Sequence, residues 1–231
     1  AAPAAPAAEP ASDHTFTANV GLFSSYRFRG IDQTFGKPAL QGGFDYSHSS
    51  GIYLGNWNSN VSQTAGYPDG NLEMDFYGGY KTTFGDFGLD VGGLYYYYPG
   101  SRGQALGLNR GAVDNGELYI AGSWKFLTLK YSYAVTDYFS LPNSDGSSYL
   151  DLSANYDLGD GWGINGHVGH LWLQNYSVGD YTDWKLGVTK DFSGTVLGLS
   201  YIGTNASNEY VSLLNKDLGK DRVLFTITRT F

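Results

Sequence analysis

The stretch Val223–Phe231 (VLFTITRTF) decides the fold because its apolar and hydroxyl-bearing residues alternate. Side chains of a β-strand point to opposite faces in turn, so this segment predicts a strand with one apolar face, interrupted by Arg229, and one mainly threonine face. Alone, the pattern fits the half-buried strand of a soluble protein. The same two-residue pattern recurs about twelve times, with no helical segment between the repeats. This repetition favours a β-barrel whose apolar face contacts lipid.

The composition fits many short strands and tight turns. The 231 residues include 33 Gly, 20 Tyr, 13 Phe and 5 Trp, but no Cys. The mean hydropathy of -0.28 would normally favour a soluble protein, and no run approaches the roughly 18 apolar residues of a transmembrane helix. Strands of a membrane barrel are apolar only at alternate positions, so they need neither a high mean hydropathy nor a continuous apolar run.

The order of the connections supports the same fold. Short turns follow the second, fourth, sixth, eighth and tenth expected strands, for example at Ser49–Gly51 and Gly85–Asp86, and longer loops follow the others. A soluble sandwich has Greek-key links that mix lengths at both ends. We therefore predict an all-β fold: a transmembrane antiparallel up-and-down β-barrel of about 12 strands, with short periplasmic turns and longer extracellular loops.

The chain divides into a short tail and one domain. Residues 1–13 (AAPAAPAAEPASD) are rich in Ala and Pro and predict a flexible periplasmic tail, with a plug inside the barrel as the alternative. Residues 14–231 are expected to form the outer-membrane barrel. Because the chain opens without a basic segment and apolar run, we expect an exported form from which a signal peptide has been removed. The absence of cysteine is compatible with that route.

The first sixty residues resemble a known family. The segments ANVGL (18–22), YRFRG (26–30), QGGFDY (41–46) and SSG (49–51), together with Gln33, are similar to the amino-terminal block of the TorF-type porin family. Ser25 departs from the acidic residue expected before Tyr26–Arg27. The resemblance implies a Gram-negative outer-membrane β-barrel with a transport role and supplies no catalytic residue.

The carboxy-terminus carries a second resemblance. The chain ends on Phe231, as do the terminal strands of Gram-negative outer-membrane barrels, whose last aromatic residue belongs to the signal read by the barrel assembly machinery. This resemblance implies that Phe231 is an assembly signal and that the assembly machinery is a partner, although Arg229 departs from the usual apolar residue.

Charged residues at the strand positions that alternate with the apolar ones are expected to line the lumen. We predict this role for Arg27, Asp45, Glu73, Asp75, Lys81, Glu117, Lys125, Lys130, Asp151, Asp183 and Lys185. These charges either pair across the strands and fill the interior or line a conducting path; the sequence leaves both alternatives open. About twelve strands should leave a narrow or plugged passage. Because acidic residues predominate, we expect weak cation preference.

Aromatic residues are expected to anchor the barrel at the membrane interfaces. Rings with an apolar body and a polar tip prefer the level of the lipid headgroups. The aromatic residues with this predicted role, all expected to face lipid, are Trp57, Tyr95, Tyr97, Trp124, Trp162, Trp172 and Trp184.

The sequence favours a channel over an enzyme. A net charge of -8 argues against nucleic-acid binding. His167 and His170 lie three residues apart, on opposite faces of a strand, so they do not predict a metal site. His48 beside Ser49 and Ser50 lies in an expected turn, so a lipid-modifying barrel enzyme is the weaker alternative. We expect no catalytic residue, metal or cofactor.

The expected function is passive diffusion of small polar solutes or ions across the outer membrane, whose lipid surrounds the barrel. The main alternative is a non-conducting structural barrel, or one whose outer loops bind a partner. The sequence leaves the oligomeric state open.

Overall fold

A computed structural model describes residues 12–67, 70–102, 111–206, 210–212 and 214–231. The expected tail, residues 1–13, lies outside this description except for Ser12 and Asp13. Among the described residues, no helix is long and apolar enough to cross a membrane. Twelve long strands form the main sheet: β1 (His14–Phe23), β4 (Ala39–His48), β5 (Ile52–Asn60), β6 (Leu72–Phe84), β7 (Phe87–Tyr97), β8 (Asn115–Trp124), β9 (Leu127–Ala134), β10 (Ser148–Gly159), β11 (Trp162–Trp172), β12 (Tyr181–Phe192), β13 (Thr195–Thr204) and β14 (Arg222–Thr230).

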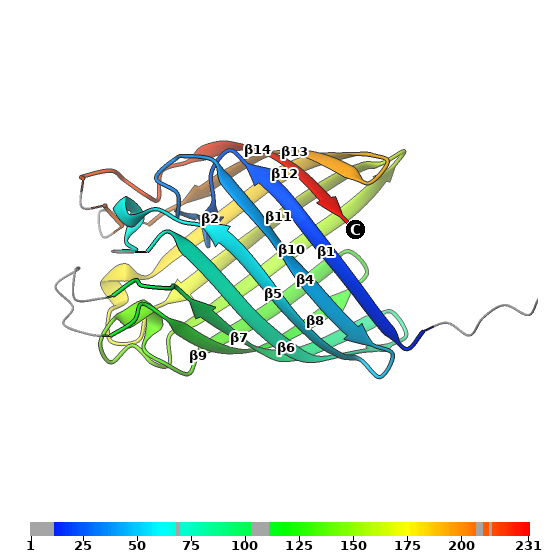
Figure 1. Cartoon of the computed structure of the whole chain (residues 1–231), viewed down its shortest axis with the longest axis horizontal. Coiled ribbons are helices and arrows are strands. Elements are labelled where there is room, and N and C mark those ends of the chain that lie inside the picture. Colours follow the sequence, from blue (N-terminus) through cyan, green and yellow to red (C-terminus); the bar gives the residue numbers. More distant parts are fainter. Residues whose placement is uncertain (1–11, 68–69, 103–110, 207–209, 213) are drawn as a thin grey trace, which may run out of the picture.

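The sheet closes on itself. Each strand pairs antiparallel with its neighbours, and β1 pairs with both β4 and β14 (Figure 1). The terminal strand predicted from VLFTITRTF is β14, where Leu22 of β1 lies opposite Ile227. Phe231 follows this strand and exchanges backbone hydrogen bonds of 2.7 and 3.1 Å with Ala18. Closure leaves no open sheet edge, which is the condition for a sheet to stand in lipid. The predicted barrel of about twelve strands is confirmed.

The two ends of the barrel differ. Tight connections follow β4, β6, β8, β10 and β12, and long connections follow the other barrel strands except the last. Figure 1 shows the long connections gathered at one end of the barrel and the tight turns at the other. We call these the loop end and the turn end. The predicted separation of short and long connections is confirmed.

The apolar residues at alternate positions of the strands face outward. Phe225 and Ile227 of β14 are 64% and 49% exposed, whereas Glu73 of β6 and Asp183 of β12 are fully buried. A soluble sandwich would show the reverse. Exposed apolar side chains recur on all twelve strands, so the outer wall suits a hydrocarbon environment.

On strand β5, the inward-facing and outward-facing positions are the reverse of those predicted. Ile52 and Leu54 of β5 are 52% and 58% exposed, so Trp57 points inward with the odd positions. The prediction that Trp57 faces lipid is therefore wrong. Asn56 and Asn58 occupy the outer face instead, where their amides donate to backbone carbonyls of the neighbouring strands at 2.9 and 3.4 Å. These bonds satisfy the polar groups, so the asparagines do not identify the inner face.

The first long connection folds into the barrel. Strand β1 ends at Phe23, and residues 24–38, which connect it to β4, form a separate segment that we call the inner loop. Within it, β2 (Arg27–Phe28) pairs with β3 (Ile31–Asp32). Between them, Arg29 and Gly30 have φ values of 47° and 80°. These left-handed conformations, which suit glycine, reverse the chain tightly.

Candidate functional site

The inner loop spans the lumen through Arg29. Its guanidinium donates to Glu117 of β8 at 2.8 Å and to the hydroxyl of Tyr138 at 2.9 Å, and it lies 4.3 Å from the ring centroid of Tyr149 on β10. Burial alone would lower the pKa of Arg29, but Glu117, Tyr138 and Tyr96 together outweigh it, so the pKa lies well above its ordinary value. Arg29 thus stays charged and holds the loop against the opposite wall.

A second anchor is Tyr26. Its hydroxyl donates to Glu73 at 3.1 Å, and its ring meets Trp57 edge to face, with centroids 5.4 Å apart. Burial, followed by the charge of Glu73, raises the pKa of Tyr26 well above its ordinary value. The phenol therefore remains a hydrogen-bond donor. Trp57 thus packs inside the barrel, beside Asp75, which is opposite it on β6.

The inner loop is also held along its other edge. Arg27 lies 3.8 Å from Asp32 and donates at 2.9 Å to the backbone oxygen of Leu218, in the last long connection. Lys216 of the same connection lies 3.5 Å from Asp32, whose side chain is fully buried. These contacts join two distant parts of the chain inside the loop end of the barrel.

A charged cluster lies on the wall formed by β10, β11 and β12. Asp151 is 2.9 Å from Nδ1 of His167, and Asp183 is 3.5 Å from Nε2 of the same ring. Tyr149 donates to Asp183 at 2.8 Å. His167 therefore stands between two carboxylates that come from neighbouring strands.

Tyrosine–carboxylate pairs occupy the turn-end half of the lumen. Tyr77 donates to Asp45 and Tyr53 donates to Asp90, both at 2.6 Å. Lys81 lies 3.6 Å from Asp90. In the same region, Lys130 has its ammonium 3.9 Å from the ring centroid of Tyr119. Much of the lumen charge is thus neutralised or hydrogen-bonded.

Two cavities lined mostly by polar residues remain in the lumen, which we call the polar cavities. One, of about 210 Å³, lies against β10, β11 and β12, and the other, of about 230 Å³, lies between the inner loop and β1, β13 and β14. His167 and Lys185 line both. Among the described residues, no carboxylate lies within ion-pair distance of the Lys185 ammonium. Lys185 therefore contributes a positive charge where the two cavities adjoin.

The structure brings most of the predicted lumen-lining residues together inside the barrel. The residues on its inner face or in the inner loop are Arg27, Asp45, Glu73, Asp75, Lys81, Glu117, Lys130, Asp151, Asp183 and Lys185. Lys125 is different: it lies exposed in the tight turn between β8 and β9, 4.7 Å from the Trp124 ring centroid. Its predicted lumen role is wrong, because the strand ends one residue before it.

Several important residues were missed. The alternation that selected the carboxylates also places Tyr77 and Tyr149 inside, so these could have been found as their donors. Tyr53 could not, because it shares a face of β5 with Trp57, which the sequence assigned to the lipid side. Arg29 gave no such signal, because it lies in a connection whose inward path depends on tertiary contacts.

The remaining predicted interface aromatics lie on the outer face. Trp124 and Trp162 stand near the turn end, and Tyr95, Tyr97, Trp172 and Trp184 nearer the loop end. Their exposed fractions range from 37% to 47%. Two belts of rings at opposite ends of an apolar wall are typical of membrane barrels.

The closed twelve-strand antiparallel sheet, with its apolar outer wall and polar lumen, defines the class: a transmembrane β-barrel with the fold seen in outer-membrane porins. The chain belongs to the family described as "Bacterial protein of unknown function (Gcw_chp)", whose profile matches residues 7–231. The narrower TorF-type assignment stays a prediction. No curated protein matches the chain.

Solved structures show the same fold at low sequence identity. The NanC porin has a TM-score of 0.57 and 10% identity, with coverage of 94% of this chain and 99% of that chain. A chain solved in work on the in-meso crystallization of membrane proteins has a TM-score of 0.55 and 9% identity, covering 94% and 83%. At such identities the likeness concerns the fold alone.

Proposed function

We propose that this protein is an outer-membrane channel for passive diffusion of small polar solutes or ions. The observation that carries the proposal is the pair of adjoining polar cavities in the lumen, which share His167 and Lys185 and of which one borders the inner loop. Solutes would pass along the wall of β10 to β13, and the inner loop would restrict their size. The resemblance of the amino-terminal block to TorF-type porins supports the same role.

The test is conductance of the purified barrel in a planar bilayer. We expect small, reproducible single-channel steps, because two cavities of about 210 and 230 Å³ leave little room beside the inner loop. A correctly folded barrel that never conducts would reject the channel. That result would favour the second candidate, a structural or partner-binding barrel, which the buried Arg29–Glu117 pair across the lumen supports.

Weak cation preference is part of the proposal. Asp45, Asp90 and Asp151 equal in number Lys81, Lys130 and Lys185 inside the lumen, and Asp157 and Asp191 add negative charge near the turn end. The reversal potential under a KCl gradient measures the preference. A potential of the sign set by chloride would contradict it.

We propose no enzymatic role. His48 and Ser50 are hydrogen-bonded at 2.8 Å, but they belong to one tight turn, and the serine amide also donates to the same histidine nitrogen at 3.1 Å. This is turn chemistry. Fatty-acid release from phospholipid by wild type, lost in Ser50→Ala, would contradict this assignment.

The cellular setting follows from the proposed role. We propose insertion in the Gram-negative outer membrane after export, recognition of Phe231 by the barrel assembly machinery, and a periplasmic position for residues 1–13. Replacing Phe231 with Ala should lower the folded fraction delivered to the outer membrane, measured by cell fractionation and heat-modifiable gel mobility.

A further inference from the structure

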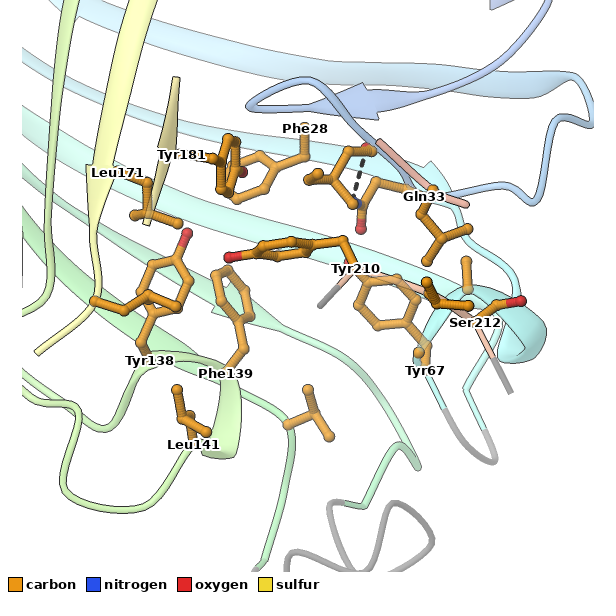
Figure 2. Close-up of a pocket in the computed structure, with 17 residues that line it drawn as sticks. Phe28, Gln33, Tyr67, Tyr138, Phe139, Leu141, Leu171, Tyr181, Tyr210 and Ser212 are labelled. Carbon is orange, nitrogen blue, oxygen red and sulfur yellow. Dashed lines mark hydrogen bonds between the residues drawn. The ribbon is translucent and has the colours of Figure 1, made fainter. Parts of the chain in front are cut away.

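A third cavity, at the loop end of the barrel, differs from the two polar ones. It has a volume of about 310 Å³ and is enclosed by residues from the inner loop and from five later connections or strand ends (Figure 2). None of its seventeen lining residues is Asp, Glu, Lys, Arg or His. The walls include six aromatic rings: Phe28, Tyr67, Tyr138, Phe139, Tyr181 and Tyr210. Such a cavity suits an uncharged, flat and apolar molecule.

The polar groups of the cavity wall are mostly occupied. Tyr138 accepts from Arg29 at 2.9 Å, Tyr210 donates to the Gly179 carbonyl at 2.8 Å, and the hydroxyl of Ser212 accepts from two backbone amides at 3.1 and 3.3 Å. The side-chain oxygen of Gln33 is different. It is buried and has no hydrogen-bond partner among the described residues.

The orientation of Gln33 is fixed. Its amide nitrogen donates to the carbonyl of Ile31 at 2.9 Å, so rotating the amide would bring two oxygens together. Its backbone accepts from Ser62 and donates to Tyr26, both at 2.9 Å. Figure 2 shows the amide nitrogen of Gln33 on its dashed hydrogen bond and the amide oxygen on the other side, toward Tyr210. A buried acceptor without a donor is unfavourable, and a ligand donor would relieve the cost.

The volume limits the ligand. A cavity of about 150 Å³ lined by apolar side chains can hold benzene. The loop-end cavity, at about 310 Å³, is close to twice that size. Its occupant should therefore have about two fused rings.

We propose that this cavity is a binding site for a small uncharged aromatic molecule of two fused rings that carries one N–H or O–H donor, accepted by the side-chain oxygen of Gln33. The ring body would pack among Phe139, Tyr181 and Tyr210. This site lies outside the polar cavities, so its occupation does not depend on whether the barrel conducts.

The test uses a single reporter thiol, since the chain has no cysteine. Val211 lines the cavity and is 40% exposed, whereas Val178 is 68% exposed and lies outside the lining. Val211→Cys and Val178→Cys are labelled with a maleimide in nanodiscs, with and without 2-naphthol. We expect saturable slowing of labelling at position 211 and no change at position 178. Equal slowing at both positions, or no slowing at 211, overturns the site.

A second comparison tests the role of Gln33. The compound 2-methoxynaphthalene keeps the two rings but has no donor, so its half-protecting concentration should be about tenfold higher than that of 2-naphthol. Gln33→Met in the Val211→Cys background should remove this difference. The two-ligand comparison needs no substitution at position 33, so it stands even if that variant folds poorly. Equal protection by both ligands in the parent background overturns the proposal.

Discussion

Arg29 shows how one side chain can hold a loop across a lumen. It is buried, and it joins the inner loop to Glu117 on β8 and to the ring of Tyr149 on β10. Breaking a buried ion pair by removing one partner costs about 3–5 kcal/mol, because the other charge is left without compensation. The inner loop is therefore held most firmly at this residue.

We predict that Arg29→Ala increases single-channel conductance and lowers stability by about 3 kcal/mol. The larger current would follow from release of the inner loop, and the loss of stability from the unpaired Glu117. Bilayer recording and urea unfolding measure the two effects. Lys125→Ala, in an exposed turn, is the control and should change neither. Unchanged conductance together with the expected loss of stability would mean that the inner loop does not restrict the path.

Lys185 should influence ion selectivity. It lines both polar cavities and has no carboxylate within ion-pair distance among the described residues. We predict that Lys185→Glu shifts the reversal potential toward cation preference, because the local charge changes sign. Lys125→Glu makes the same charge change outside the lumen and should leave the potential unaltered. An equal shift in both variants would assign the effect to overall charge.

At the scale of the strand, β5 tests the assignment of inner and outer faces. Trp57 packs against Tyr26 inside the barrel, whereas Trp184 of β12 is 37% exposed on the outer wall. We predict that brominated lipid quenches the fluorescence of a protein retaining only Trp184, but not that of one retaining only Trp57, with the other tryptophans replaced by Phe. Strong quenching of Trp57 would instead support the lipid-facing position that the sequence predicted for this residue.

Close contact between β4 and β5 requires glycine. A Cβ added to Gly43 would lie 2.0 Å from the backbone oxygen of Asn56, which no side-chain movement could relieve. At Gly122 of β8, an added Cβ would meet nothing within 4 Å. We predict that Gly43→Ala lowers the fraction of heat-modifiable folded barrel at least severalfold and that Gly122→Ala leaves it unchanged. Similar folding of the two variants would contradict this close approach of the two strands.

At the scale of the whole molecule, the inner loop is separable from the barrel. Phe23 and Ala39 lie opposite each other on β1 and β4, so a short turn can replace residues 24–38 without straining either strand. The replaced segment would no longer fill the lumen beside the two polar cavities. The strand pairs that close the barrel, such as Leu22 with Ile227, lie outside the replaced segment, so we expect the barrel to stay closed.

We predict that replacing residues 24–38 with a short Gly-Asn turn gives a folded barrel with several times the wild-type conductance, since channel current grows with open cross-section. Replacing residues 174–179 with Gly and Ser, outside the inner loop, is the control. Heat-modifiable mobility would report folding, and bilayer recording would report current. A folded barrel with wild-type current would show that the inner loop does not limit flow.

The sequence by itself determined the barrel, its strand number and its two unlike ends, because lipid and a polar interior impose a two-residue alternation, which strands such as Val223–Phe231 carry with few interruptions. It also selected most of the inward charges. It misassigned Trp57, because Asn56 and Asn58 satisfy their amides on backbone carbonyls and can face outward. Only the tertiary structure decided that residues 24–38 enter the lumen, because their partners Glu73, Glu117 and Leu218 lie on distant segments that come together when the sheet closes.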